Sequence, residues 1–220
     1  MSAEPRRLVL LRHGRTAWNA EGRAQGHADV ELDEVGHAQA AAVAPWVARW
    51  CPTVLVSSDL ARARQTAAYV EKETGLTLAL DARLREYDVG DRTGLTMPEF
   101  AEQFPEEHAA WRADRRRAVL GAEGPAEVAA RIVPACQDVL AALQPGDTAV
   151  LVTHGAALKV AVLGLLGWPQ QQADSLRVLD NCAVALLEQV EQLDQAPSFR
   201  LVAWNLRPTG VEFASGQGGG

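Results

Sequence analysis

A short apolar run that ends in charged residues constrains this 220-residue chain more than any other feature. Residues 8–11 read Leu-Val-Leu-Leu, and Arg12, His13 and Gly14 follow directly. Such a run predicts a buried strand, and buried strands of α/β sheets present functional residues at their carboxyl ends. Gly14 is expected to let the backbone turn there. Because a guanidinium and a charged imidazole repel each other, we expect an anion to bind between Arg12 and His13.

Strand and helix patterns alternate along most of the chain. This alternation predicts an α/β three-layer sandwich, with a mostly parallel sheet, an antiparallel edge strand and helices on both faces. Asp33 and Asp59 are expected to cap helices, and Gly75 is expected to end one. The expected strands are 8–11, 53–58, 76–80, 148–153, 182–188 and 199–204, and the expected helices are 34–50, 60–73, 127–143 and 156–166.

The segment from residue 87 to about residue 124 interrupts the alternation. It has no strand pattern and several glycines and prolines, so we expect an inserted cap of short helices. Residues 1–220 contain no linker or internal repeat and are expected to form one domain. The tail, 215–220, is expected to be disordered. The cap run Arg115-Arg116-Arg117 is expected on a solvated face, with binding of a second anionic group as the alternative.

Composition excludes several classes of protein. The net charge of −7 argues against a nucleic-acid partner, which would need a basic surface. The longest apolar run, 155–168, is interrupted by Lys159 and is shorter than the ~20 residues of a membrane span. Three scattered cysteines fit neither a disulfide framework nor a zinc cluster, so a reduced, cytoplasmic protein is expected. A homodimer is compatible with the sequence, although no pattern specifies one.

Two predicted strands each end in a histidine followed by glycine, namely His13-Gly14 and His154-Gly155. A single histidine is more often a structural residue, but the ends of two core strands meet at one edge of a parallel sheet, so two histidines there can share a pocket. A zinc site is the first alternative, and no third ligand repeats this placement, so no metal is expected. Arg62 follows the second strand and, with Arg12, would form a cationic cradle suited to phosphate. The alternative is that Arg62 is an ordinary exposed helix residue.

Further polar groups follow the same strands. The helix that begins near Gly155 would offer N–H groups to an anion, and Asn19, Gln25 and Gly26 lie on the loop after His13. Glu86 follows the third strand, either as a surface ion-pair partner or as a proton donor to a leaving oxygen. A carboxyl beside a bound phosphate dianion is more readily protonated, which favours the donor role.

Three segments resemble the signature of the histidine phosphatase superfamily, the phosphoglycerate-mutase-like enzymes. They are residues 12–19 (Arg-His-Gly-Arg-Thr-Ala-Trp-Asn), 58–67 (Ser-Asp-Leu-Ala-Arg-Ala-Arg-Gln-Thr-Ala) and 152–155 (Val-Thr-His-Gly). The resemblance extends from Arg7 to Asn205 and is strengthened by Glu86 in register. Within the superfamily, the chain is similar to the mycobacterial-type glucosyl-3-phosphoglycerate phosphatases. Where many relatives read Gly-Gly-Glu-Ser, residues 121–124 read Gly-Ala-Glu-Gly, which puts an inherited substrate in doubt.

The resemblance implies a covalent mechanism without a cofactor. His13 would attack phosphorus, His154 and the two arginines would offset charge on the phosphate oxygens, and Glu86 would protonate the leaving alkoxide. The expected substrate is a small phosphate ester such as glucosyl-3-phosphoglycerate. A bisphosphoglycerate-dependent phosphoglycerate mutase is the first alternative, although residues 92–121 lack the Tyr and Lys positions of mutase caps. The second is a non-catalytic scaffold, which would be expected to have lost one of these site residues.

Overall fold

The computed structural model describes residues 4–114, 121–190 and 198–208. Its sheet has the strand order β3-β2-β4-β1-β5-β6. Strands β1 to β4 pair in parallel, whereas β5 and β6 run antiparallel and form one edge. The predicted α/β class and antiparallel edge are therefore confirmed. The bounds are β1 Arg6–Arg12, β2 Val54–Ser57, β3 Leu78–Leu80, β4 Thr148–Thr153, β5 Val184–Val190 and β6 Ser198–Leu206.

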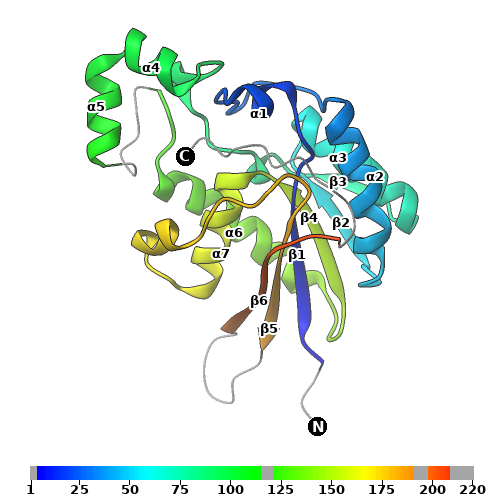
Figure 1. Ribbon diagram of the computed structural model, residues 1–220. Helices are drawn as coiled ribbons and strands as arrows, with labels where there is room; N and C mark the ends of the chain where they lie inside the picture. The colour runs from blue at the N-terminus through cyan, green and yellow to red at the C-terminus, as the bar shows by residue number, and fades with distance from the viewer. Residues whose placement is uncertain (1–3, 115–120, 191–197, 209–220) are drawn as a thin grey trace.

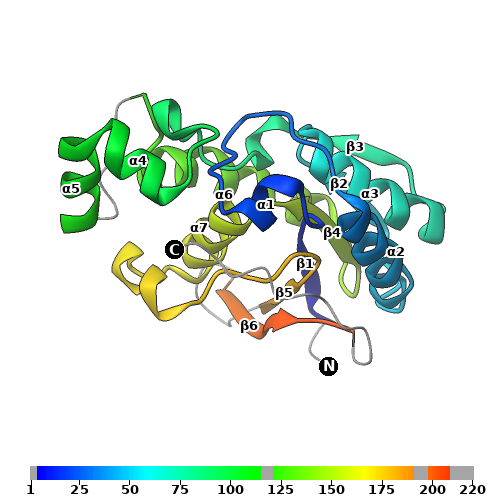
Figure 2. The same ribbon diagram turned by 45° about the horizontal axis from the view of Figure 1, so that its top comes forward.

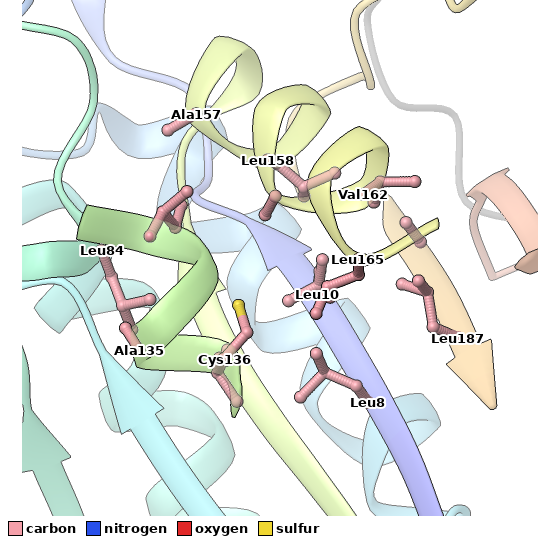
Figure 3. Packing of buried hydrophobic residues seen from close by; sticks show 14 of the residues in the cluster. Leu8, Leu10, Leu84, Ala135, Cys136, Ala157, Leu158, Val162, Leu165 and Leu187 are labelled. Carbon is pink, nitrogen blue, oxygen red and sulfur yellow. The ribbon is translucent and has the colours of Figure 1, made fainter. Parts of the chain in front are cut away.

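The alternation of side chains along β1 divides the core into two layers. Leu8 and Leu10 pack into a cluster with residues of α6 (Pro125–Ala142) and α7 (Gly155–Leu166), as Figure 3 shows. Val9 and Leu11 pack on the opposite face, against α2 (Glu34–Ala48) and α3 (Ala61–Thr74). Because successive strand residues point to opposite faces, one run of four apolar residues supports both helical layers (Figure 1).

Helix ends follow the sequence at two of the three positions predicted. Asp33 caps α2 by accepting from the N–H of Gly36, and Gly75 ends α3 with a φ of 71°. The prediction that Asp59 caps α3 is wrong. The Asp59 carboxylate pairs with Arg85, and the N–H of Ala61 donates to Asp29 instead. A carboxylate distant in sequence thus supplies the cap because the guanidinium is the stronger partner for Asp59.

The region expected to form the cap consists of short helices: η2 (Gly90–Arg92), α4 (Met97–Gln103) and α5 (Pro105–Ala113). An isolated antiparallel bridge, Val89 to Ala122, joins its two ends. In Figures 1 and 2, α1 lies near the carboxyl end of β1, and α4 and α5 extend beyond this end of the sheet to one side. Arg115, Arg116 and Arg117, and the tail 215–220, lie outside the described residues.

Three short helices of the described residues lie outside both the cap and the predicted helices. Residues expected as a loop include α1 (Ala17–Glu21), which Thr16 caps by accepting from the N–H of Asn19. The remaining short helices are η1 (Ala82–Leu84) and η3 (Gln170–Ser175). The predicted strand 76–80 is shorter in the structure, and the helix α6 continues through Pro134. Among the described residues, no helix has both the length and the apolar character needed to cross a membrane.

Candidate active site

The carboxyl ends of β1 and β4 bring His13 and His154 together. These parallel neighbours place Arg12 opposite Thr153, so each histidine follows its strand at the same edge of the sheet. The ring centroids lie 5.1 Å apart and the rings are tilted by 57°. Helix α1 lies over this edge (Figure 2). The structure therefore places the two histidine rings side by side, as predicted.

His13 is held in one tautomer by its own chain. Its Nδ1 lies 2.7 Å from the carbonyl oxygen of Gly14, and since a carbonyl only accepts, Nδ1 carries the proton. The lone pair of a neutral ring is then on Nε2. Burial lowers the pKa of His13 well below its usual value, and the cations of Arg62 and Arg12 lower it further. The imidazole is therefore neutral and able to act as a nucleophile.

Gly14 is required for close packing. Its φ is not positive, so a turn that only glycine could make is not its role. A Cβ at this position would lie 2.6 Å from the carbonyl oxygen of Gly36, at the start of α2. The N–H of Gly14 donates to Thr66 on α3 over 3.0 Å. The expected backbone turn is thus replaced by a contact that fixes the His13 loop between α2 and α3.

Both ring nitrogens of His154 have partners. The Nε–H of Arg62 donates to Nδ1 over 3.2 Å, and Nε2 lies 2.9 Å from the hydroxyl of Ser58. Because Arg62 only donates, the proton of a neutral ring is on Nε2 and points to Ser58. Burial lowers the pKa of His154 well below its usual value, with Arg62, His13 and Arg12 adding to the effect. In this state His154 orients Arg62 and is itself oriented by Ser58.

Arg62 is buried, with 1% of its surface exposed, and the exposed-residue interpretation is wrong. Besides His154, it donates to the carbonyl oxygens of Ala28 and Gly26, each over 2.8 Å. Burial lowers the pKa of the guanidinium to about 10, while Glu86 and Asp29 raise it and Arg12 lowers it. The group remains cationic at neutral pH, and three neighbours fix its plane.

Arg12 donates through Nη1 to the carbonyl oxygen of Leu179. Its Nε is buried and has no hydrogen-bond partner among the described residues. Burial lowers the pKa of the guanidinium, whereas Glu86, Asp180 and Cys182 raise it. A Cβ at Gly155 would lie 3.2 Å from that Nε and 2.9 Å from Val178. Glycine at 155 thus leaves room beside an unused, buried cationic donor.

Glu86 lies at the amino end of α7. Its Oε1 accepts from the N–H groups of Ala157 and Tyr87, each over 2.9 Å, and its Oε2 accepts from Ala156 over 3.0 Å. The helix N-terminus expected to bind phosphate therefore gives two of its N–H groups to this carboxylate. The surface ion pair considered for Glu86 is not formed, because Arg83 and Arg85 bind Asp81, Asp138 and Asp59 instead.

The Asn19 side chain connects α1 to the nucleophile through a residue that the sequence did not single out. Asn181 donates from Nδ2 to the carbonyl oxygen of His13 over 3.0 Å and to Oδ1 of Asn19 over 3.3 Å. Oδ1 of Asn19 also accepts from Thr16, so its amide N–H groups face away from these partners. Asn181 carries no sequence signal beyond its place before a late strand. Ser58 could have been found, as a small polar residue at a strand end.

Gln25 and Gly26 have different positions in this arrangement. Gly26 holds Arg62 through its carbonyl oxygen, and its φ of 49° together with a Cβ position 2.6 Å from Val89 excludes a side chain there. Gln25 is buried, and its Oε1 has no partner among the described residues.

In the described part of the chain, no group of three or more His, Cys, Asp or Glu could hold a metal ion.

The two neutral histidines predict a pH-dependent stability. As the pH falls below about 6.5, the unfolded chain protonates both, whereas their lowered pKa values keep the folded protein from doing so. Stability should therefore decrease by about 1.4 kcal/mol per pH unit for each histidine. Urea titrations between about pH 7 and pH 5 measure this slope. The slope should be shallower in His13→Gln, and equal slopes would contradict the expectation.

Comparison with known proteins gives consistent similarities. Residues 8–206 match the family model of the Histidine phosphatase superfamily (branch 1). A glucosyl-3-phosphoglycerate phosphatase of Mycobacterium tuberculosis (strain CDC 1551 / Oshkosh) is 42% identical over 176 residues, covering 74% of this chain and 79% of the relative. A probable phosphoglycerate mutase GpmB of Cronobacter sakazakii is 35% identical over 192 residues, covering 82% and 84%. A solved mycobacterial glucosyl-3-phosphoglycerate phosphatase in complex with VO3 superimposes with a TM-score of 0.83 at 37% identity, covering 91% and 98%.

Proposed function

Because the chain belongs to the histidine phosphatase superfamily, we propose that it is a metal-independent phosphomonoesterase acting through a phosphohistidine. The observation that carries this proposal is the state of His13. Its Nδ1–H is bound to Gly14 and its pKa is lowered by burial and two arginines, so Nε2 offers a lone pair. A neutral nucleophile beside fixed cations is what attack on a phosphate monoester requires.

The reaction has two steps. Nε2 of His13 attacks phosphorus, the bond from phosphorus to the ester oxygen breaks, and Glu86 gives its proton to the leaving alkoxide. Water then attacks phosphorus, the nitrogen–phosphorus bond breaks, and Glu86 takes the proton from that water. Arg12, whose Nε has no hydrogen-bond partner in the described part of the chain, and Arg62 offset charge on the phosphate oxygens in both steps. Asn19 and the N–H of Gly155 are the neutral donors to phosphate in this proposal.

The proposed substrate is glucosyl-3-phosphoglycerate or a related phosphoglycerate or sugar phosphate. Similarity to the mycobacterial phosphatases supports this choice. The departure at residues 121–124 weakens it less than the sequence suggested. Gly124 is the N-cap of α6 and donates its N–H to Glu127. A serine is favoured at an N-cap, so its absence affects the start of a helix. Gln25 and Gly26 are the proposed substrate-side residues of the loop after His13.

A mutase is the second candidate, since a probable phosphoglycerate mutase is among the relatives. A mutase keeps the phosphoenzyme and returns the phosphoryl group to a second hydroxyl. Residues 92–121 hold neither tyrosine nor lysine with which to bind the second acid group of a phosphoglycerate. Hydrolysis is therefore the reaction that this cap favours.

Phosphate release decides between these functions. We expect glucosyl-3-phosphoglycerate to be hydrolysed with kcat/KM of about 10⁴ M⁻¹s⁻¹ or higher, unchanged by EDTA. Isomerisation of 3-phosphoglycerate with 2,3-bisphosphoglycerate present should be undetectable. Faster isomerisation than hydrolysis would establish the mutase, and loss of activity in EDTA would exclude the metal-independent mechanism. The absence of turnover on phosphorylated sugars, glycerates and amino acids alike would favour a scaffold.

A further inference from the structure

Arg131 on α6 uses all five of its N–H donors. Nε and one Nη2–H bind the two carboxylate oxygens of Glu123, over 2.8 and 2.7 Å. The other three hydrogen bonds go to main-chain carbonyl oxygens: Nη1 to Arg83 over 2.9 Å and to Arg85 over 2.7 Å, and Nη2 to Glu86 over 2.7 Å. A guanidinium saturated in this way has one allowed orientation, since its donors form a planar fork.

Glu123 extends this network to the base of the cap. Its Oε2 also accepts from the N–H of Asp88 over 2.8 Å, and its own N–H donates to the carbonyl oxygen of Asp88 over 2.9 Å. The neighbouring residues Val89 and Ala122 form the antiparallel bridge that joins the ends of the cap. The Arg131–Glu123 pair therefore ties α6 and both cap ends to the segment that carries Glu86.

The Glu86 backbone is held from two sides. Its carbonyl oxygen accepts from Arg131 and lies 2.8 Å from Nε2 of His27. Its carboxylate is bound by the first turn of α7. Within the described part of the chain, the hydrogen bonds of Arg131 and Glu123 do not reach His13, His154 or Arg62, although the Arg131 charge helps to lower the pKa of His154. The side chain and the main chain of Glu86 are thus fixed by different elements, and Arg131 accounts for the main-chain part.

We propose that Arg131, oriented by Glu123, is a positioning residue for the general acid of this enzyme. It acts through Glu86 and touches no substrate. A carboxyl must lie within hydrogen-bond reach of the leaving oxygen to transfer its proton, and a displacement of about 1 Å can cost about 10²-fold in rate. The proposal rests on the acid role given to Glu86 in the proposed function. It assigns to a residue of α6 the positioning of the group that protonates the leaving alkoxide.

The test compares two leaving groups. The alkoxide of an alkyl phosphate needs a proton in order to leave, whereas the p-nitrophenolate of p-nitrophenyl phosphate leaves without one. We expect Arg131→Met to lower kcat on the alkyl ester by about 10- to 100-fold, with little change in KM and a much smaller loss on p-nitrophenyl phosphate. Glu86→Gln is the reference for complete loss of the acid. In the Glu86→Gln background, Arg131→Met should cost less than about twofold more, because two residues acting on one step are not additive.

Two further variants guard against a general loss of structure. Arg83→Met removes an arginine whose carboxylate partners are Asp81 and Asp138, and it leaves the carbonyl oxygen of residue 83 in place. It should affect both esters equally or not at all. Glu123→Gln keeps the shape of the side chain and should give a smaller loss of the same selectivity, so it carries the test if Arg131→Met does not fold.

The outcomes separate the inference from the proposed function. Selective loss in Glu86→Gln, together with equal losses on both esters in Arg131→Met and Glu123→Gln, would overturn the positioning role and leave the acid assignment standing. Additive losses in the double variant would overturn it as well. Equal losses on both esters in Glu86→Gln would instead remove Glu86 from the acid role, and with it the basis of the inference.

Discussion

Replacing His13 with glutamine is expected to abolish turnover, with a loss on the order of 10⁴- to 10⁶-fold in kcat, as for other covalent nucleophiles. The neutral ring presents Nε2 to the phosphate only because Nδ1 is committed to Gly14. Glutamine has no lone pair of comparable nucleophilicity, so the covalent step has no substitute within the site. Steady-state release of inorganic phosphate gives the size of the loss.

A rapid quench identifies the intermediate directly. Wild-type protein mixed with a phosphate ester should carry a phosphoryl group that is stable to base and lost in acid, as a phosphoramidate is. The matched control is His37→Gln, a histidine on α2 that contacts the Tyr69 hydroxyl at 3.2 Å and lies outside the site. It should label and turn over as wild type does. Labelling that persists in His13→Gln would place the nucleophile elsewhere.

The fold was predictable where the sequence carries its own local pattern. An apolar run such as residues 8–11 needs no knowledge of its neighbours to be recognised as a buried strand. Residues that directly follow such strands can then be placed at a common edge, and the pairing of β1 with β4 does bring His13 near His154. Arg62 is placed in the same way, because it lies in the first turn of the helix that follows β2.

The parts that failed depend on contacts between distant segments. Asp59 has the local pattern of a helix cap, but Arg85 competes for its carboxylate and Asp29 takes over the cap. Asn181 and Arg131 act through carbonyl oxygens. Every residue has such a group, so no sequence pattern marks the acceptor. Position along the chain could show which residues reach the site, but it could not show what holds them there.

Arg62→Lys is the second substitution expected to have a large effect, although it keeps the charge. Arg62 binds His154 and two carbonyl oxygens at once, those of Gly26 and Ala28. A lysine ammonium is a mobile point charge and cannot satisfy this fixed fork. Loss of a charge-assisted contact of roughly 2–3 kcal/mol corresponds to about a 30- to 150-fold lower rate. If the contact forms mainly in the transition state, kcat should fall together with kcat/KM.

The affinity for vanadate and a control substitution at the neighbouring Arg64 complete this test. Inorganic phosphate or vanadate should inhibit wild type competitively and bind Arg62→Lys more weakly, because the variant lacks the planar donor pair. Arg64, two residues along α3, has 47% of its side chain exposed, and Arg64→Lys should match wild type in both measurements. A wild-type rate and vanadate affinity in Arg62→Lys would mean that the guanidinium serves the loop at Gly26 and Ala28 alone. Phosphate would then be held by Arg12, whose buried Nε is the remaining cationic donor of the site without a partner among the described residues.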